Sequence, residues 1–444
     1  MKHVVIIGNG ISGVTAARHI RKLSNHRITV ISGESEHFFS RTALMYIYMG
    51  HMKYEHTKPY EDRFWAKNRI ELKKAWVELV NTQEKRITFQ GGETMDYDSL
   101  ILATGSKSNK FGWPGQDLDG VGGLYSLQDL ENMEKHTQNI KQAVIVGGGL
   151  IGVEMAEMLL TRNIKVIFLV REDRFWGNVL PTEEGQLIAR HITEEHHIDL
   201  RLNTELKEIL ADHQGRARAV ITGTGEEIPC QFVGLTAGVS PNVDFLKNSS
   251  IEIQRGILVN EYLETNVPDV YAIGDCAQRQ VAAFNRRPIE QVWYTGRMMG
   301  EIVAKTVAGN RTAYNPGYWF NSAKFFDIEY QTYGWVFNEL LEGEKTFYWE
   351  SKDHKKCLRI NYKADNGRVN GMNIFGMRQR HEVWDQWLQQ GRNIDFVLEN
   401  LPTANFDPEF FKQYEAEIIE KYNRETGKNL KIKTKKGLFA KIFA

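Results

Sequence analysis

The chain has few cysteines, and their placement excludes several kinds of site. Only three of its 444 residues are cysteines, Cys230, Cys276 and Cys357, and they lie far apart in the sequence. No C-x-x-C or C-x4-C spacing occurs, so no disulfide framework is indicated. Chains without structural disulfides are typical of reducing compartments, and we therefore expect a cytoplasmic protein.

Long apolar runs and an excess of one charge are also missing. No uninterrupted apolar stretch approaches the roughly 18 residues that a membrane-spanning helix needs. The 56 basic residues balance the 56 acidic ones, so the net charge is zero. A balanced charge gives no electrostatic argument for binding nucleic acid, and we expect no nucleic-acid partner.

The histidines show no pattern that indicates a metal. There are 13 of them, and none has the spacing of a known metal site. The adjacent pair His196 and His197 would point its two side chains apart on either a helix or a strand. We therefore predict no metal site.

Glycines near the N-terminus are the first feature that points to a function. Four apolar residues, Val4 to Ile7, lead into Gly8-x-Gly10-x-x-Gly13, and a helical pattern follows. Gly8 permits the turn, Gly10 lets a phosphate approach the backbone, and Gly13 lets the helix pack on the strand. The helix N-terminus adds unpaired N–H groups and a partial positive charge. The segment therefore predicts a site for a dinucleotide pyrophosphate.

Residues 27–31 predict the next strand, and sites of this type place an acidic residue after it. That residue binds a ribose hydroxyl about 20 residues beyond the glycines. Glu34 and Glu36 are both available, and we favour Glu34. Arg41 is a candidate partner for the pyrophosphate, and a solvated loop arginine is the alternative.

The glycine segment occurs a second time. Residues 143–156 again predict a strand, a turn and a helix, with Gly147, Gly149 and Gly152 at the same spacing. A further strand is expected over 165–170. A repeated unit makes coincidence improbable and indicates that the chain binds two nucleotides.

Two small-residue turns follow buried strands. The turn Ala103-Thr104-Gly105 ends one of them, and small residues let the backbone come close to a ligand. Asp275 follows a short strand over 270–273. In an open α/β sheet the carboxyl ends of the strands are where ligands bind, so Asp275 is a candidate ligand-binding residue.

The composition changes after residue 313. Aromatic residues become frequent, and the alternating segment 357–362 predicts an antiparallel strand that ends near a hairpin turn at 365–368. Helices are expected over 379–400 and 408–423. The chain then ends in a lysine-rich tail that includes a few apolar residues.

These motifs occur in an order that resembles the FAD- and pyridine-nucleotide-dependent oxidoreductases of the glutathione reductase superfamily. Within it, the chain is similar to the branch of ferredoxin reductases, rubredoxin reductases, nitrite-reductase flavin subunits and apoptosis-inducing factor. The resemblance implies an α/β fold with two Rossmann-like dinucleotide-binding domains, the first split in sequence, and an α+β C-terminal domain. The implied boundaries are 1–110 and 250–312 for FAD, 113–245 for NAD(P), 313–425 for an interface-like domain and 426–444 for the basic tail.

The resemblance also implies roles for individual residues. FAD would be held by Gly8, Gly10, Gly13, Glu34, Arg41, Ala103, Thr104, Gly105 and Asp275. NAD(P)H would be held by Gly147, Gly149, Gly152 and Arg171. Glu154 would lie near the nicotinamide as a catalytic residue, although a carboxylate in a first helical turn can also simply stabilise its helix.

The chain departs from the family pattern in several ways. No cysteine pair is available beside the flavin, so disulfide reduction is not expected, and Cys276 is interpreted as a packing residue. The usual ribose-binding acid of the branch aligns with Gly33, one residue before Glu34. A lysine expected five residues after Arg41 is replaced by Tyr46.

The preferred nicotinamide nucleotide stays open between NADH and NADPH. Val170 occupies the usual position of the acid that favours NAD. Arg171 resembles the arginine that binds the 2′-phosphate of NADPH, yet Glu172 and Asp173 follow it and oppose its charge.

The predicted function is an FAD-dependent NAD(P)H oxidoreductase that passes hydride to FAD and then electrons to an external acceptor. A ferredoxin or rubredoxin-like protein is the favoured acceptor, and a homodimer is expected. The alternatives are an NADH:quinone reductase held on a membrane surface by the tail Lys428–Ala444, an NAD(P)H oxidase, and an NADH-sensing flavoprotein. Trp319, Phe320 and Phe326 would pack either beside the flavin or in an ordinary core.

Overall fold

The computed structural model describes residues 1–281, 286–406 and 409–433. The chain divides into two compact units. The first unit contains Met1–Arg171 and Asn203–Pro316, and the second contains Glu172–Leu202 and Gly317–Ala444. The second unit therefore combines a segment from the middle of the chain with the C-terminal residues. The finer division into three domains stays a prediction.

The first unit contains a five-stranded parallel sheet centred on the opening strand. Strand β1 (His3–Ile7) pairs with β2 (Arg27–Ser32) on one side and β7 (Ser99–Leu102) on the other. The outer strands are β3 (Ile70–Lys74) and β19 (Val270–Ala272). Because β19 comes from far along the chain, the sheet brings the turn at Asp275 to the N-terminal residues. The strands predicted over 4–7 and 27–31 are confirmed.

A second parallel sheet of the first unit repeats this construction. Its central strand β10 (Gln142–Val146) pairs with β11 (Lys165–Leu169) and β16 (Phe232–Leu235). Strand β16 also pairs with the short β9 (Val121–Gly122). Helix α5 (Leu150–Thr161) follows the second glycine turn. The predicted repeat of strand, turn and helix is therefore confirmed.

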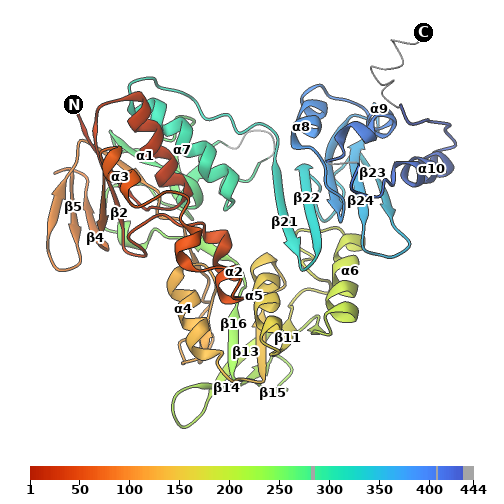
Figure 1. Cartoon of the computed structure of the whole chain (residues 1–444), viewed down its shortest axis with the longest axis horizontal. Coiled ribbons are helices and arrows are strands. Elements are labelled where there is room, and N and C mark those ends of the chain that lie inside the picture. Colours follow the sequence, from red (N-terminus) through yellow and green to blue (C-terminus); the bar gives the residue numbers. More distant parts are fainter. Residues whose placement is uncertain (282–285, 407–408, 434–444) are drawn as a thin grey trace. The chain divides into compact units, whose positions relative to one another are not determined.

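Helices α1 (Ile11–Leu23) and α7 (Trp293–Val307) pack side by side in the first unit (Figure 1). A Cβ atom added at Gly296 would lie 2.5 Å from the hydroxyl oxygen of Ser12, and one added at Gly300 would lie 2.6 Å from the Ser12 carbonyl oxygen. Such separations are too short for carbon in a packed interior. Gly296 and Gly300 are about one helical turn apart on α7, and their lack of side chains sets the distance between the two helices.

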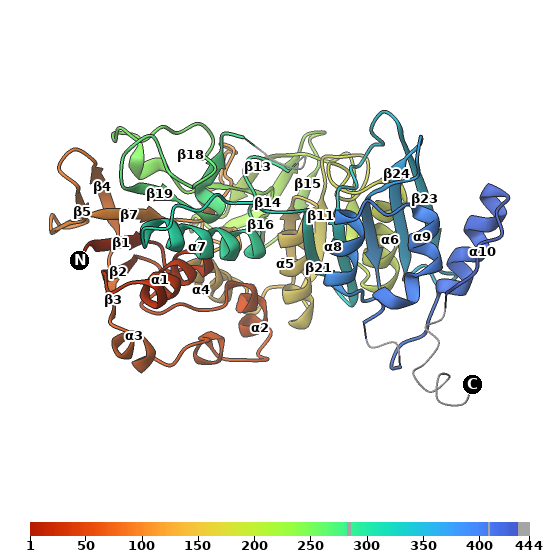
Figure 2. The same cartoon turned by 90° about the horizontal axis from the view of Figure 1, so that it is seen from above.

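The second unit is built on an antiparallel sheet. Its strand order is β21 (Phe320–Phe325), β22 (Ile328–Gly334), β25 (Val369–Phe375), β24 (Cys357–Lys363) and β23 (Glu344–Glu350). Helices α8 (His381–Gln389) and α9 (Ile394–Glu399) lie against this sheet (Figure 2). Their buried residues Trp384 and Val397 share one core with Leu358 of β24. The strand predicted over 357–362 is confirmed.

Two helix predictions for the second unit need correction. The single helix predicted over 379–400 is wrong, because α8 and α9 are separate. Gly391 between them has a φ of +61°, and the side chain of Asn393 accepts a hydrogen bond from the backbone N–H of Phe396 to start α9. Residue 408, where the second predicted helix starts, lies outside the described residues; from 409 onward the helix begins later than predicted, as α10 (Glu415–Thr426).

The remaining helices and strands complete the two units. The remaining α-helices are α2 (Leu44–Tyr48), α3 (Arg63–Lys67), α4 (Leu127–His136) and α6 (Thr182–Arg190). The remaining strands are β4 (Val77–Asn81), β5 (Arg86–Phe89), β6 (Thr94–Asp96), β8 (Ser106–Ser108), β12 (Asp199–Arg201), β13 (Leu206–Ala211), β14 (Ala217–Thr222), β15 (Glu227–Pro229), β17 (Val239–Pro241), β18 (Ile257–Val259) and β20 (Ala277–Arg279). Within the described ranges, no helix has the length and apolar character to cross a membrane.

Replacing Gly300 with valine is expected to destabilise the first unit by roughly 1–3 kcal/mol, the usual cost of forcing atoms into a packed interior. The added atoms would press on the backbone of Ser12 and push α1 and α7 apart. Lys305→Val places the same side chain on an exposed position of α7 and is the matched control. Urea unfolding followed by circular dichroism measures both variants. Equal stability of the two would contradict the role given to Gly300.

Candidate functional site

In the first glycine turn, two glycines pack directly against other backbone atoms, whereas the third faces open space. Gly8 has a φ of +116°, and a Cβ atom there would overlap the carbonyl oxygen of Ala103. A Cβ atom at Gly13 would overlap the carbonyl oxygen of Gly8. At Gly10, the N-cap of α1, no atom lies within 4 Å of the Cβ position. This open space at a helix N-terminus fits a pyrophosphate group.

The second glycine turn has the same construction. Gly147 has a φ of +112°, and a Cβ atom there would lie 2.8 Å from the backbone of Thr236. A Cβ atom at Gly152 would lie 2.5 Å from the carbonyl oxygen of Gly147. Gly149 is the N-cap of α5, and no acidic residue occupies the first turn of that helix. Both predicted turns therefore present a helix N-terminus suited to an anion.

Asp275 lies in a connected group of polar side chains. Its Oδ2 accepts hydrogen bonds from the hydroxyl of Ser106 at 3.1 Å and from the hydroxyl of Tyr125 at 3.2 Å. Gln291 donates to Ser106 Oγ at 2.8 Å, and the Ser106 N–H donates to the Tyr125 hydroxyl. Burial raises the pKa of the Asp275 carboxyl.

The sequence singled out Asp275 as a candidate but not the residues that surround it. Ser106 directly follows the predicted turn that ends at Gly105, and this adjacency was the one available signal. Tyr125 and Gln291 belong to no motif. Tyr125 also packs against the turn at Ala103-Thr104-Gly105, because a Cβ atom at Gly105 would lie only 2.7 Å from the Tyr125 hydroxyl oxygen.

Glu34 and Arg41, predicted separately for ribose and pyrophosphate, bind each other. The guanidinium of Arg41 donates to both carboxylate oxygens of Glu34, at 2.8 and 2.6 Å. Glu34 also accepts from the backbone N–H of Leu127 at 2.8 Å. Arg41 donates to the carbonyl oxygen of Tyr125 and lies 4.7 Å from the centre of its ring. The pair thereby joins the loop after β2 to the segment that carries Tyr125.

Gly33, where the related branch usually has its ribose-binding acid, faces an aromatic ring. A Cβ atom at Gly33 would overlap the indole of Trp76. Trp76 is 52% exposed, so one part of its ring stays accessible to a ligand. An acidic side chain at position 33 and Trp76 in its present place exclude each other. Sequence reasoning did not identify Trp76, because it lies in a segment without a motif.

Glu154 has an unusual environment for a carboxyl group. It lies half-buried on α5, two residues after Gly152. Burial, with a smaller contribution from Glu157, raises the pKa of Glu154 to about 7. Both protonation states are therefore populated near neutral pH, a property that is frequent in functional carboxyl groups.

The remaining positions that the sequence singled out are the three cysteines and the residues directly after β11. Cys230, Cys276 and Cys357 are free and buried, and burial raises the pKa of each thiol, which disfavours the reactive thiolate. Val170 is buried, whereas the neighbouring Arg171 is exposed.

Two further predictions concern the second unit. Trp319 stacks on Trp335 with ring centres 5.1 Å apart, Phe320 is half-buried and Phe326 is buried. A position beside a flavin stays a prediction, and an ordinary core stays its alternative. Two tail lysines form ion pairs, Lys428 with Asp395 at 2.7 Å and Lys433 with Glu399 at 2.5 Å. The other end of the tail, 434–444, lies outside the described residues.

Comparison with known proteins agrees with this arrangement. The family model described as pyridine nucleotide-disulphide oxidoreductase matches residues 2–300. Rubredoxin-NAD(+) reductase of Acinetobacter baylyi is 31% identical over 289 residues, which cover 63% of this chain and 72% of that protein. The biphenyl dioxygenase system ferredoxin–NAD(+) reductase component of Paraburkholderia xenovorans is 28% identical over 306 residues, which cover 68% of this chain and 74% of that protein. A crystal structure of a ferredoxin reductase from Rhodopseudomonas palustris shares the fold, with a TM-score of 0.77 and 23% identity over 92% of this chain and 96% of that one.

Gly10→Val is expected to weaken the binding of FAD and to leave the fold intact. The Gly10 φ of −70° suits any residue, and the new side chain would enter open space that the pyrophosphate needs. FAD affinity, measured by equilibrium dialysis, is expected to fall at least about tenfold, or 1.4 kcal/mol. Gly223→Val, at an exposed glycine outside the turn whose φ is not positive and whose Cβ atom would meet nothing closer than 3.7 Å, is the control for the purified FAD content. Unchanged FAD affinity in Gly10→Val would contradict this assignment.

Glu154→Gln is expected to raise the melting temperature at about pH 8 and to change it little at about pH 5. The folded-state pKa of about 7 lies above the ordinary value of 4.5, so ionisation of Glu154 costs folding free energy. This cost is absent below the ordinary pKa and complete above the folded-state pKa. Glutamine never ionises and therefore avoids it. Differential scanning calorimetry measures the effect, with exposed Glu131→Gln as the control; the same shift at both pH values would contradict it.

Proposed function

The chain belongs to the pyridine nucleotide-disulphide oxidoreductase family, and from this premise we propose that it passes electrons from NAD(P)H through FAD to a small redox protein of the ferredoxin or rubredoxin type. It is an oxidoreductase, and its cofactors are FAD and NAD(P)H. The observation that carries the proposal is the pair of glycine turns, each opening at a helix N-terminus.

The first turn would hold FAD and the second NAD(P)H. The N–H groups at the start of α1 bind the FAD pyrophosphate at the open space beside Gly10. Asp275 is held through Oδ2 by Ser106 and Tyr125, and it offers its other oxygen to a ribityl hydroxyl. FAD, when bound, supplies the hydride acceptor and the change from two-electron to one-electron chemistry.

Glu154 would act on the nicotinamide side. It lies one turn into α5, two residues after Gly152 of the second glycine turn, and not in the first helical turn where a carboxylate would simply stabilise the helix. When ionised, its carboxylate stabilises the positive charge that an oxidised nicotinamide ring carries. Because its pKa is raised to about 7, this stabilisation strengthens as the pH rises through neutrality.

An external acceptor is favoured by the buried thiols of the chain. A family member that reduces disulfides needs accessible cysteines, and all three cysteines are buried here. The two relatives compared above are named for rubredoxin and ferredoxin. The homodimer, the cytoplasmic location and a membrane contact of the basic tail stay predictions.

Anaerobic mixing of the purified protein with NADH or NADPH tests the proposal. Either nucleotide is expected to bleach the yellow flavin absorbance, and comparison of the two rates identifies the preferred nucleotide. A ferredoxin or a rubredoxin is then expected to restore the colour faster than oxygen or a quinone in lipid vesicles. Faster reoxidation by oxygen would indicate an oxidase, and faster reoxidation by the quinone a quinone reductase. A protein that takes up no FAD would overturn the proposal.

A further inference from the structure

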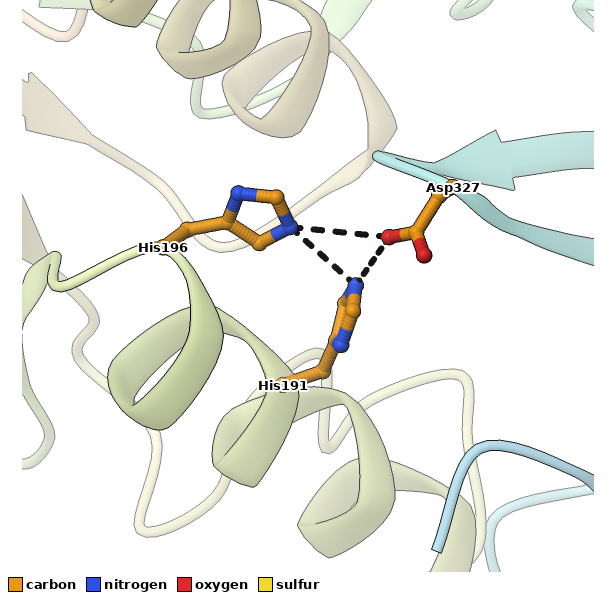
Figure 3. A group of neighbouring side chains, drawn as sticks. All are labelled: His191, His196 and Asp327. Carbon is orange, nitrogen blue, oxygen red and sulfur yellow. Dashed lines mark hydrogen bonds and ion pairs between the residues drawn. The ribbon is translucent and has the colours of Figure 1, made fainter. Parts of the chain in front are cut away.

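Three side chains that commonly bind metals converge in the second unit (Figure 3). Nε2 of His191 lies 2.6 Å from Oδ1 of Asp327 and 3.2 Å from Nε2 of His196. Nε2 of His196 lies 3.6 Å from the same Oδ1. Two imidazoles and a carboxylate therefore point their ligand atoms at one common position.

A local change of helix type brings the two histidines together. Residues His191–Glu195 form a π-helical turn that directly follows α6. On a regular α-helix, side chains five positions apart project about 140° from each other. A π turn has a hydrogen bond from residue i to i+5, so it rotates the sixth residue back toward the first, and such turns are frequent at functional sites. His196 thus faces His191, whereas His197 is exposed.

A tight hairpin supplies the carboxylate. Phe326 and Asp327 are the two residues that join β21 to β22. Phe326 has a φ of +56°, which is rare for a bulky residue and indicates local strain. Its buried ring stacks on His196, with ring centres 3.8 Å apart and an angle of 19° between the planes. The strained turn therefore holds Asp327 and His196 in place together.

Hydrogen bonds alone cannot satisfy all the ring nitrogens that meet in this group. When Nε2–H of His191 donates to Asp327, the same nitrogen has no lone pair to accept a hydrogen bond from His196. The two ring nitrogens then meet at 3.2 Å with at most one shared proton between them.

We propose that His191, His196 and Asp327 form a site for a divalent transition-metal ion, with zinc as its first candidate. Zinc bonds of about 2.0–2.1 Å in a tetrahedron separate the ligand atoms by about 3.3 Å. The two separations that involve His196, 3.2 and 3.6 Å, are close to this value, and the 2.6 Å hydrogen bond between His191 and Asp327 would widen when the ion replaces its proton. Imidazole nitrogens favour zinc and similar ions over magnesium and calcium. The ion takes two nitrogens and one oxygen from the chain, and water fills the remaining position.

The ion would link two distant parts of the sequence within the second unit. It joins the π turn, which belongs to the segment Glu172–Leu202, to the β21–β22 hairpin of the segment Gly317–Ala444. An ion that binds the folded unit and not the unfolded chain raises the stability of the folded state. Zinc binding is thus expected to stabilise the second unit, independently of the electron acceptor.

Titration of the full, tag-free, FAD-loaded chain with zinc chloride tests the proposal. After treatment with a chelator, isothermal titration calorimetry is expected to show one zinc ion per chain, and excess magnesium chloride is expected not to compete. His196→Gln and Asp327→Asn are expected to weaken zinc binding at least about tenfold. These two are the more accessible members of the group, so their replacement spares the buried His191.

A matched control variant and the melting temperature, as a second measurement, distinguish loss of the zinc site from a general effect of mutation. His197→Asn replaces the neighbouring exposed histidine and suits its φ of +53°, so zinc affinity is expected to stay unchanged. Zinc is expected to raise the melting temperature of the wild type and of His197→Asn but not of Asp327→Asn. Equal zinc affinity in all variants, or no stoichiometric binding by the wild type, would overturn the proposal.

Discussion

The first unit depends on a close contact that only glycine permits. Ser12, in the first turn of α1, faces Gly274, Gly296 and Gly300, and a Cβ atom at any of these would come within 2.6 Å of it. The contact lets α7 and the turn at Asp275 approach the opening glycine turn. The glycine turn encoded in the first residues of the chain, the candidate site for a pyrophosphate, is therefore bounded by residues from the second half of the chain.

The charged groups near the two glycine turns are stabilised in different ways. Glu34 is compensated by Arg41 and by a backbone N–H, so its charge serves to join two segments. Asp275 is surrounded by hydroxyl donors. Glu154 has a pKa raised by burial and by a neighbouring carboxylate. With a pKa of about 7, Glu154 can change its charge near neutral pH, where nicotinamide chemistry would use it.

The two units bind their candidate ligands by different principles. Each glycine turn of the first unit is a continuous segment, and the backbone itself offers the binding groups. The histidine and aspartate group of the second unit combines a π turn with a strained hairpin. Its ligand atoms come from side chains whose positions depend on the packing of Phe326 against His196.

The sequence by itself determined both glycine turns, the strands before them and the turn at Asp275, because strand, turn and helix lie within one short stretch and local sterics dictate each glycine. Tertiary structure alone decided that Trp76 faces Gly33 and that Tyr125 and Gln291 reach the Asp275 turn, since these contacts join segments far apart in the chain. Glu34 pairs with Arg41 across only seven residues, but the loop between them has no regular structure from which the pairing follows. Tertiary structure also decided the break between α8 and α9 at Gly391, where one residue outweighs the propensity of a long helical pattern. His191 and His196 escaped sequence reasoning because a regular helix would separate them, and Asp327 meets them only through the folding of the second unit.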